Sequence, residues 1–281
     1  MKATTYFILS IILFLTQYVV AQEIIYTRED SVIIENIIQQ EAGINSSTIG
    51  DKIISIAQEF IGERYVPETL DRHSNEPLFI SCTEFDCTTF VETTLAIAKT
   101  GKNDNFATAC NNLELIRYRN GVRNGYASRL HYISWWIADS AKQNIIKEVY
   151  TNHHTATQQT ELNFMSSNAD RYNQLKNDAS LINDIAKYEQ EFGCKSNRYI
   201  PKENILKIEE TDIKNGDIIA IVTDIKGLDV SHMGFAIWHN EKLHMIHASS
   251  SEKTVLLDTT PLADYINKRK RHIGIRVFRA L

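Results

Sequence analysis

The chain has 281 residues, with 30 basic and 35 acidic side chains and a formal net charge of −5 at pH 7. This acidic balance, with no basic stretch that carries interleaved aromatic residues, argues against nucleic acid as a partner. A chain of this length can bury a large core without disulfide bonds, and its four prolines and lack of a Gly/Ser-rich run predict one compact domain.

Residues 1–21 have the layout of a secretory signal peptide. Lys2 precedes a short apolar run, and Val19 and Ala21 supply the small residues of a cleavage site. The run is short for a membrane span, so an uncleaved anchor helix is the weaker alternative. We expect cleavage, a mature chain with 29 basic and 35 acidic residues (net −6), no stable membrane anchor, and a periplasmic location.

Helices are predicted in the first part of the mature chain. Residues 31–62 carry aliphatic side chains at helical spacing and end at a glycine. A loop over 64–82 contains prolines, asparagine and other polar residues. Beyond it, Phe90 and Leu95 share one face of a further helix, and Gly101 ends that helix.

From residue 140 to residue 197 the composition shifts toward Asn, Gln, Thr, Ser and Lys. A helical stripe persists within this stretch and stops at Gly193. We therefore predict a helical insertion at about 138–200 within a single catalytic domain that spans 22–281.

The last third of the sequence changes from helical to strand periodicity. Short β-rich runs separated by Gly, Asn, Asp and Ser favour consecutive antiparallel strands. The runs are 217–224, 231–238, 242–249, 253–258 and 273–280. Helices followed by a sheet place the fold in the α+β class, with the helices packed on a C-terminal antiparallel sheet.

Cys87 stands in the segment EFDCTTFVE, beside an acid, at the start of a predicted helix. The helix N-terminus favours a thiolate, and Asp86 suits the N-cap position. A buried structural thiol and a disulfide partner remain alternatives, because Cys82, Cys110 and Cys194 show no regular framework. The chain has no CxxC or HExxH pattern, so we predict no metal and no cofactor.

Two histidines are candidates to activate such a cysteine. His232 begins an apolar strand, and His247 ends the next strand along the chain. If these strands pair around the turn at residues 240–241, both histidines lie at one end of the sheet. His232 can then serve as the base and His247 as the group that orients its imidazole.

These segments resemble the NlpC/p60 cell-wall hydrolases, which are papain-like cysteine enzymes. The matching segments occur in the family's order and are IGERYVPETLD (61–71), EFDCTTFVE (84–92), KNGDIIAIV (214–222), SHMGFAIW (231–238) and HMIHAS (244–249). The block RYRNGVRNGYASRLHYISWWI resembles a narrower branch, the N-acetylmuramoyl-L-alanine amidase-like proteins. The resemblance implies a papain-like fold with Cys87, His232 and His247 as a catalytic triad, in which Cys87 and His232 form a thiolate–imidazolium pair held by His247.

Further site residues follow from the same resemblance. The Cys87 backbone N–H, helped by the Tyr65 hydroxyl, is expected to stabilise the oxyanion. In the branch-specific block, four residues are candidates for substrate contacts, through carboxylate binding by arginine and stacking by aromatic rings. They are Arg129, His131, Tyr132 and Trp135. The alternative for the tyrosine and the tryptophan is packing in the core.

The expected activity is hydrolysis of the amide between (anhydro-)N-acetylmuramic acid and L-alanine in peptidoglycan fragments. The first alternative is a γ-D-glutamyl-L-diamino acid endopeptidase, which has the same triad and a different groove. A non-catalytic wall-binding module and a metal-dependent amidase are the others. Muropeptides are the expected partners in each of the enzymatic cases.

Overall fold

The computed structural model describes residues 23–43, 48–73, 75–151 and 155–281. The predicted signal peptide, residues 1–21, lies outside the described residues. Within the described part of the chain, no helix combines the length and the apolar character that a membrane span requires.

Five helices form one layer of the structure. The sequence predicted helical structure in two parts of this layer, over residues 31–62 and in the segment that contains Phe90 and Leu95. Polar side chains cap several of them: the Thr48 hydroxyl accepts from the Asp51 N–H at 3.1 Å, and the Asn105 side chain accepts from the Thr108 N–H at 3.2 Å. The helices are α1 (Arg28–Gly43), α2 (Ile49–Glu59), α3 (Cys87–Ala98), α4 (Phe106–Arg117) and α5 (Ile133–Lys142). Two short strands, β1 (Ile24–Ile25) and β3 (Leu78–Phe79), pair beside this layer.

The five predicted C-terminal strands are all present and form an antiparallel sheet, which confirms the α+β class. They are β8 (Ile218–Thr223), β9 (Val230–His239), β10 (Lys242–Ser249), β11 (Thr254–Leu257) and β12 (His272–Ala280). In the described residues the whole sheet has the order β4-β2-β11-β10-β9-β8-β12-β7-β6, and β5 pairs with β12. Strands β2 (Arg64–Tyr65) and β4 (Glu84–Phe85) pair in parallel at one edge.

The segment predicted as a helical insertion is only partly helical. Its helices are α6 (Phe164–Ser167) and α7 (Ala179–Phe192), and its strands are β5 (Ile146–Glu148), β6 (Ala156–Thr160) and β7 (Lys195–Pro201). Strands β6 and β7 extend the main sheet beyond β12. They carry mostly polar residues because much of each strand is exposed, so the apolar alternation that marks a strand is absent.

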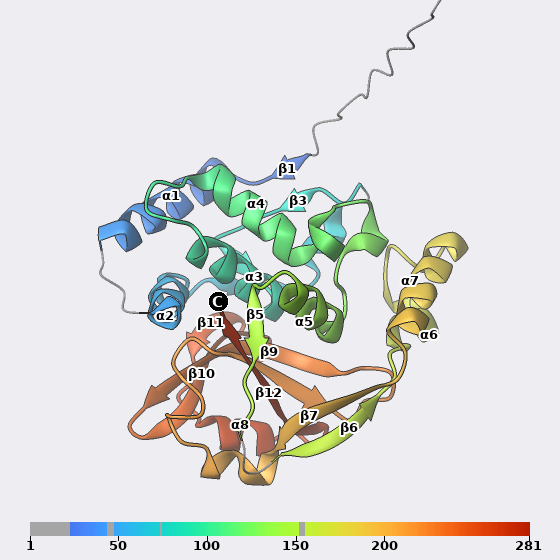
Figure 1. Ribbon diagram of the computed structural model, residues 1–281. Coiled ribbons are helices and arrows are strands. Elements are labelled where there is room, and N and C mark those ends of the chain that lie inside the picture. Colours follow the sequence, from blue (N-terminus) through green and yellow to red (C-terminus); the bar gives the residue numbers. More distant parts are fainter. Residues whose placement is uncertain (1–22, 44–47, 74, 152–154) are drawn as a thin grey trace, which may run out of the picture.

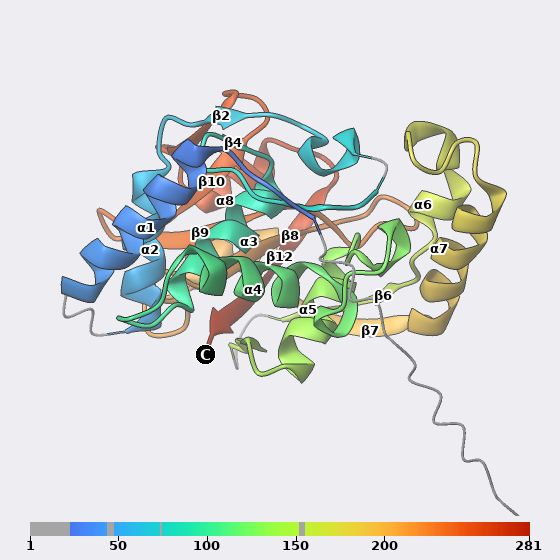
Figure 2. The ribbon, with the colours of Figure 1, turned by 90° about the horizontal axis from the view of Figure 1, so that it is seen from above.

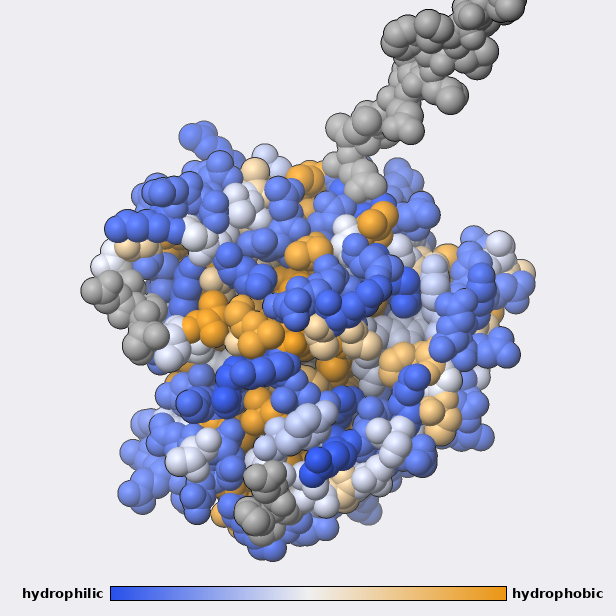
Figure 3. Space-filling view, viewed as in Figure 1, coloured by the Kyte–Doolittle hydropathy of each residue, from blue (hydrophilic) through white to orange (hydrophobic). Residues whose placement is uncertain are grey.

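The sheet is covered on both faces. Helices α1–α5 lie on one face, the short α8 (Leu262–Asn267) lies on the other, and α6 and α7 stand beside the β6–β7 end (Figures 1 and 2). Met233 and Phe235 of β9 pack into the larger core under the helices, whereas Ala236 of the same strand packs with Ile266 of α8. Figure 3 shows a largely hydrophilic face with apolar residues gathered along the seam between helices and sheet.

Candidate active site

Cys87 is the first residue of α3, and Asp86 caps that helix as predicted. One Asp86 carboxylate oxygen accepts from the backbone N–H groups of Thr88 (3.0 Å) and Thr89 (2.7 Å), and the Thr89 hydroxyl accepts from the Asp86 N–H at 2.9 Å. This reciprocal capping box fixes the first turn of α3. The position of Cys87 at the N-terminus of the helix is therefore well defined.

Aromatic packing seats α3 on the sheet. The ring of Phe90 meets that of Phe235 on β9 edge to face, with centroids 5.6 Å apart. At the start of the same helix, the backbone N–H of Met233 is near enough to the Cys87 thiol to lower its pKa. Met233 directly follows His232, so the packing brings the predicted nucleophile to the segment that carries the predicted base.

His232 and His247 are neighbours, as the hairpin geometry predicted. The Nε2 atom of His232 lies 2.6 Å from the Nδ1 atom of His247. Strands β9 and β10 pair in antiparallel register at this end of the sheet. A Cβ atom at Gly234 would lie 2.8 Å from the Cβ of His247, so the glycine of the HMG motif leaves the space that His247 occupies.

Asp258 extends this arrangement, although the sequence did not predict it as a site residue. Its Oδ2 atom lies 3.4 Å from Nε2 of His247, which is long for a hydrogen bond and leaves a charge–dipole contact. Burial by itself raises the pKa of Asp258, but its contact with His247 and the hydrogen bond from the Thr260 N–H outweigh burial and hold the pKa below its usual range. The one sequence feature that could have indicated Asp258 is its place at the end of the predicted strand over residues 253–258.

The negative charge on Asp258 determines which ring nitrogens of His247 and His232 carry a proton. A carboxylate attracts the Nε2–H of His247, which leaves Nδ1 of that ring to accept from the Nε2–H of His232. Nδ1 of His232 is then the ring nitrogen that stays free to accept a proton. Asp258, His247 and His232 thus form one ordered row of side chains, called the relay below.

The surroundings of His232 favour its uncharged form. Burial is the main cause that lowers its pKa well below the usual value, followed by the nearby His247, His272 and Arg269, while Asp258 acts in the opposite direction. The Tyr265 ring on α8 stands beside both histidines, with centroids 6.2 Å from His232 and 5.4 Å from His247. A neutral imidazole is the form that can accept a proton.

The prediction of a resting thiolate–imidazolium pair is not supported. Burial, followed by the charge of Asp86, raises the pKa of the Cys87 thiol to about 12, although hydrogen bonds from Met233 and from the helix start act to lower it. The pKa of His232 is lowered at the same time, so both shifts favour the uncharged thiol and the uncharged imidazole. The sequence indicated the helix terminus but gave no measure of how deeply the thiol is enclosed.

Tyr65 lies near Cys87. Parallel pairing of β2 with β4 sets Tyr65 opposite Phe85, two residues before Cys87. Burial, followed by the nearby Cys87 and Asp86, raises the pKa of the Tyr65 phenol to about 12. The hydroxyl therefore keeps its proton and remains a hydrogen-bond donor at neutral pH.

Arg129 does not offer a free guanidinium to a ligand. Its Nε and Nη2 atoms bind the two carboxylate oxygens of Glu76 at 2.9 and 2.8 Å, and its Nη1 atom lies 2.9 Å from Asp71. The prediction that this arginine holds a substrate carboxylate is therefore not supported. His131 packs on the Tyr126 ring and contacts the Tyr126 carbonyl oxygen at 2.8 Å.

Tyr132 and Trp135 belong to the core, which was the alternative considered for them. The Tyr132 hydroxyl donates to Glu189 at 2.6 Å and accepts from the Met165 N–H at 2.7 Å. The Trp135 ring packs against Tyr132 at 4.7 Å, and only 2% of Trp135 is exposed. Both residues join α5 to the α6–α7 region and contact no member of the relay.

All four cysteines are free thiols. Cys82 and Cys110 are buried, and Cys194 is exposed. Among the described residues, no group of three His, Cys, Asp or Glu side chains is arranged to hold a metal ion.

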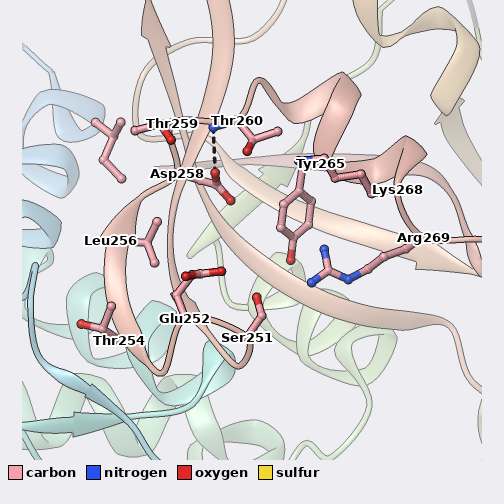
Figure 4. Close-up of a pocket in the computed structure, with 11 residues that line it drawn as sticks. Ser251, Glu252, Thr254, Leu256, Asp258, Thr259, Thr260, Tyr265, Lys268 and Arg269 are labelled. Atoms are coloured by element: carbon pink, nitrogen blue, oxygen red, sulfur yellow. Dashed lines mark hydrogen bonds between the residues drawn. The ribbon is translucent and has the colours of Figure 1, made fainter.

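An open cleft of about 720 Å³ lies next to the relay (Figure 4). Asp258 and Tyr265 line it, and both residues also contact His247. Lys268 and Arg269, at the end of α8, form one wall. Figure 4 shows Glu252, from the β10–β11 turn, on the other side of the opening.

The solved structures that resemble this one include a N-acetylmuramoyl-L-alanine amidase from Bacteroides uniformis ATCC 8492, with 36% sequence identity and a TM-score of 0.79 over 83% of this chain and 99% of that one. A structure described as a candidate xylanase from Bacteroides fragilis has 41% identity and a TM-score of 0.75, over 80% and 99% of the two chains. A Legionella pneumophila protein has 22% identity and a TM-score of 0.67, over 91% and 97%, and supports the fold alone.

No curated protein is significantly similar to the chain. The family described as N-acetylmuramoyl-L-alanine amidase-like (AmiA-like) matches residues 55–275, which include Tyr65, Cys87, His232, His247 and Asp258. This match covers most of the 281 residues. The chain therefore belongs to the N-acetylmuramoyl-L-alanine amidase-like family.

Proposed function

We propose that this protein is a cysteine-dependent N-acetylmuramoyl-L-alanine amidase. It hydrolyses the amide between (anhydro-)N-acetylmuramic acid and L-alanine in peptidoglycan fragments. The observation that carries the proposal is the row Asp258–His247–His232, which ends at a free imidazole nitrogen beside the strand segment that lies near the Cys87 thiol. The family and its B. uniformis member supply the substrate class.

The reaction begins from the neutral pair. As the Cys87 sulfur bonds to the amide carbonyl carbon, its proton passes to Nδ1 of His232, and charge develops on the carbonyl oxygen. The Cys87 backbone N–H at the start of α3 and the Tyr65 hydroxyl stabilise this oxyanion. Because thiol and imidazole are both uncharged at rest, attack and proton transfer occur together.

The second half of the reaction restores the enzyme. Protonated His232 gives its proton to the alanine nitrogen as the carbon–nitrogen bond breaks, and a muramoyl thioester remains on Cys87. Water then attacks the thioester carbonyl and gives a proton to His232, which returns it to the leaving sulfur. His247 and Asp258 hold the His232 ring in one orientation through both proton transfers.

The wider assignment also remains a proposal. The order of the motifs supports membership of the NlpC/p60 superfamily, and the cysteine at a helix start facing strand histidines supports a papain-like arrangement. The layout of residues 1–21 supports export and action in the periplasm on muropeptides.

Digestion of a defined anhydro-muropeptide, followed by mass spectrometry, tests the proposed bond. Free anhydro-sugar with an intact peptide is the expected result. A shortened peptide that remains on the sugar would identify the γ-D-glutamyl endopeptidase instead. Binding without cleavage would identify a wall-binding module, and activity lost on chelation with EDTA would identify a metal-dependent amidase.

A further inference from the structure

The cleft beside the relay has walls of opposite charge. Lys268 and Arg269 lie on the α8 side, and Glu252 lies across the opening from them (Figure 4). Asp258 also faces the cleft, but its carboxylate accepts the Thr260 N–H at 2.8 Å and contacts His247. The negative charge of Asp258 is therefore already engaged by protein groups.

The two cations on the α8 wall are available to a ligand. Within the described residues, neither Lys268 nor Arg269 forms an ion pair. The Arg269 guanidinium instead rests over the Tyr265 ring, with its central carbon 4.4 Å from the ring centroid. This stacking holds the guanidinium at the cleft, and its planar donors match a carboxylate.

The cleft is close enough to the chemistry to hold part of the same substrate. Tyr265 lines the cleft, and its ring centroid lies 5.4 Å from that of His247. Tyr265 is also near enough to Cys87 for a charge on that cysteine to raise the pKa of the Tyr265 phenol. Leu256, another lining residue, pairs directly with His247 across β10 and β11. A substrate with its scissile amide at Cys87 can thus extend along β11 toward α8.

We propose that Arg269, with Lys268 beside it, binds a carboxylate on the peptide part of the substrate. This inference rests on the proposed function, in which the peptide carries the free carboxylates and the anhydro-sugar carries none. Glu252 on the facing wall repels a carboxylate, so the peptide binds with its anionic side toward α8. Arg269 is then a specificity residue that selects anionic peptides.

The experiment compares two substrates that differ in the charge of the peptide: anhydro-N-acetylmuramoyl-L-Ala-D-Glu and its diamide, in which both glutamate carboxyls are amides. The wild-type protein should prefer the acid by about tenfold to a hundredfold in kcat/KM, as expected for a charge-assisted bidentate contact. Arg269→Gln should reduce this preference to about threefold or less. Lys270→Gln, which removes an exposed charge next in sequence and outside the cleft, should leave the preference unchanged.

The quantity that tests the inference is the ratio of kcat/KM for the acid to kcat/KM for the diamide, and not the rate on either substrate. Arg269 also touches Tyr265 and its charge lowers the pKa of His232, so its removal alters the rate on both substrates alike. The inference is overturned if the wild type cuts the acid and the diamide equally. It is also overturned if Arg269→Gln keeps the full preference, or if Lys270→Gln loses it to the same extent.

A failure of the proposed function is distinguishable from a failure of this inference. If the wild-type protein cuts neither compound, calorimetry measures the binding of both to the intact protein and to Arg269→Gln. Tighter binding of the acid that disappears in Arg269→Gln supports the carboxylate site without the amidase reaction. Equal binding of the acid and the diamide to the intact protein overturns it.

Discussion

The Nε2 atom of His232 lies 2.6 Å from the Nδ1 atom of His247, and this contact determines which nitrogen of His232 stays free for the proposed reaction. With Nε2 engaged, only Nδ1 is left to accept the proton that the proposed mechanism takes from Cys87. His247 is wholly buried and cannot turn to solvent, so the imidazole of His232 has one orientation. The base is therefore positioned before any substrate arrives.

Cys87→Ala should abolish hydrolysis, with a loss of at least about 1,000-fold in kcat, because no other group on α3 can form the thioester. The fold should persist, since the Asp86 cap does not use the thiol. Circular dichroism and thermal unfolding check the fold, and product analysis checks the activity. Cys194→Ala, the same change at an exposed thiol, is the control and should remain fully active.

Activity should persist at pH values where an ordinary histidine would already be protonated. The reaction requires neutral His232, and burial, with the charges of His247, His272 and Arg269, holds its pKa well below 6.5. As pH falls from 8, kcat/KM is expected to stay level through about pH 6.5 and to decline only below it. Half-loss of kcat/KM at or above pH 6.5, with the fold intact by circular dichroism, would contradict this assignment.

Asp258→Asn should lower kcat while the protein stays folded. An amide provides no charge to favour Nε2–H on His247, so the tautomer that directs Nδ1 of His232 toward Cys87 loses its preference. A reduction of about tenfold to a hundredfold is expected, as for residues that orient a catalytic histidine indirectly. The acid limb of the pH profile should move as well, because Asp258 acts on the pKa of His232.

Asp264→Asn is the matched control for that change. Asp264 lies on α8, is exposed, and does not contact His247. An equal loss of kcat in both variants, with no movement of the pH profile, would remove Asp258 from the relay.

Arg129→Gln should act on stability and not on substrate binding. Arg129 is 8% exposed and pairs with Asp71 and Glu76, so its removal leaves the buried Glu76 and the half-buried Asp71 without this counter-charge. Loss of one partner from a buried pair costs about 3–5 kcal/mol of unfolding free energy. Denaturant unfolding measures this loss. KM, measured where the variant is folded, should match the wild type, and a selective rise in KM would restore Arg129 as a substrate ligand.

The sequence alone determined the helix and strand types wherever burial left a periodic pattern. Strands β8–β12 alternate between two buried faces, and α3 follows a clear N-cap at Asp86, so their types could be predicted within a residue or two. Strands β6 and β7 escaped prediction because an exposed sheet end needs no apolar alternation.

For the site, the sequence determined the identities of the chemical groups, since a helix start before Cys87 and histidines on successive strands are local features. Only the tertiary structure decided which groups meet. Asp258 joins His247 through strand pairing, and Arg129 is lost to ligands because Asp71 and Glu76 surround it. The protonation of Cys87 and His232 was decided in the same way, because the cost of a buried charge depends on surrounding atoms that are distant in the chain.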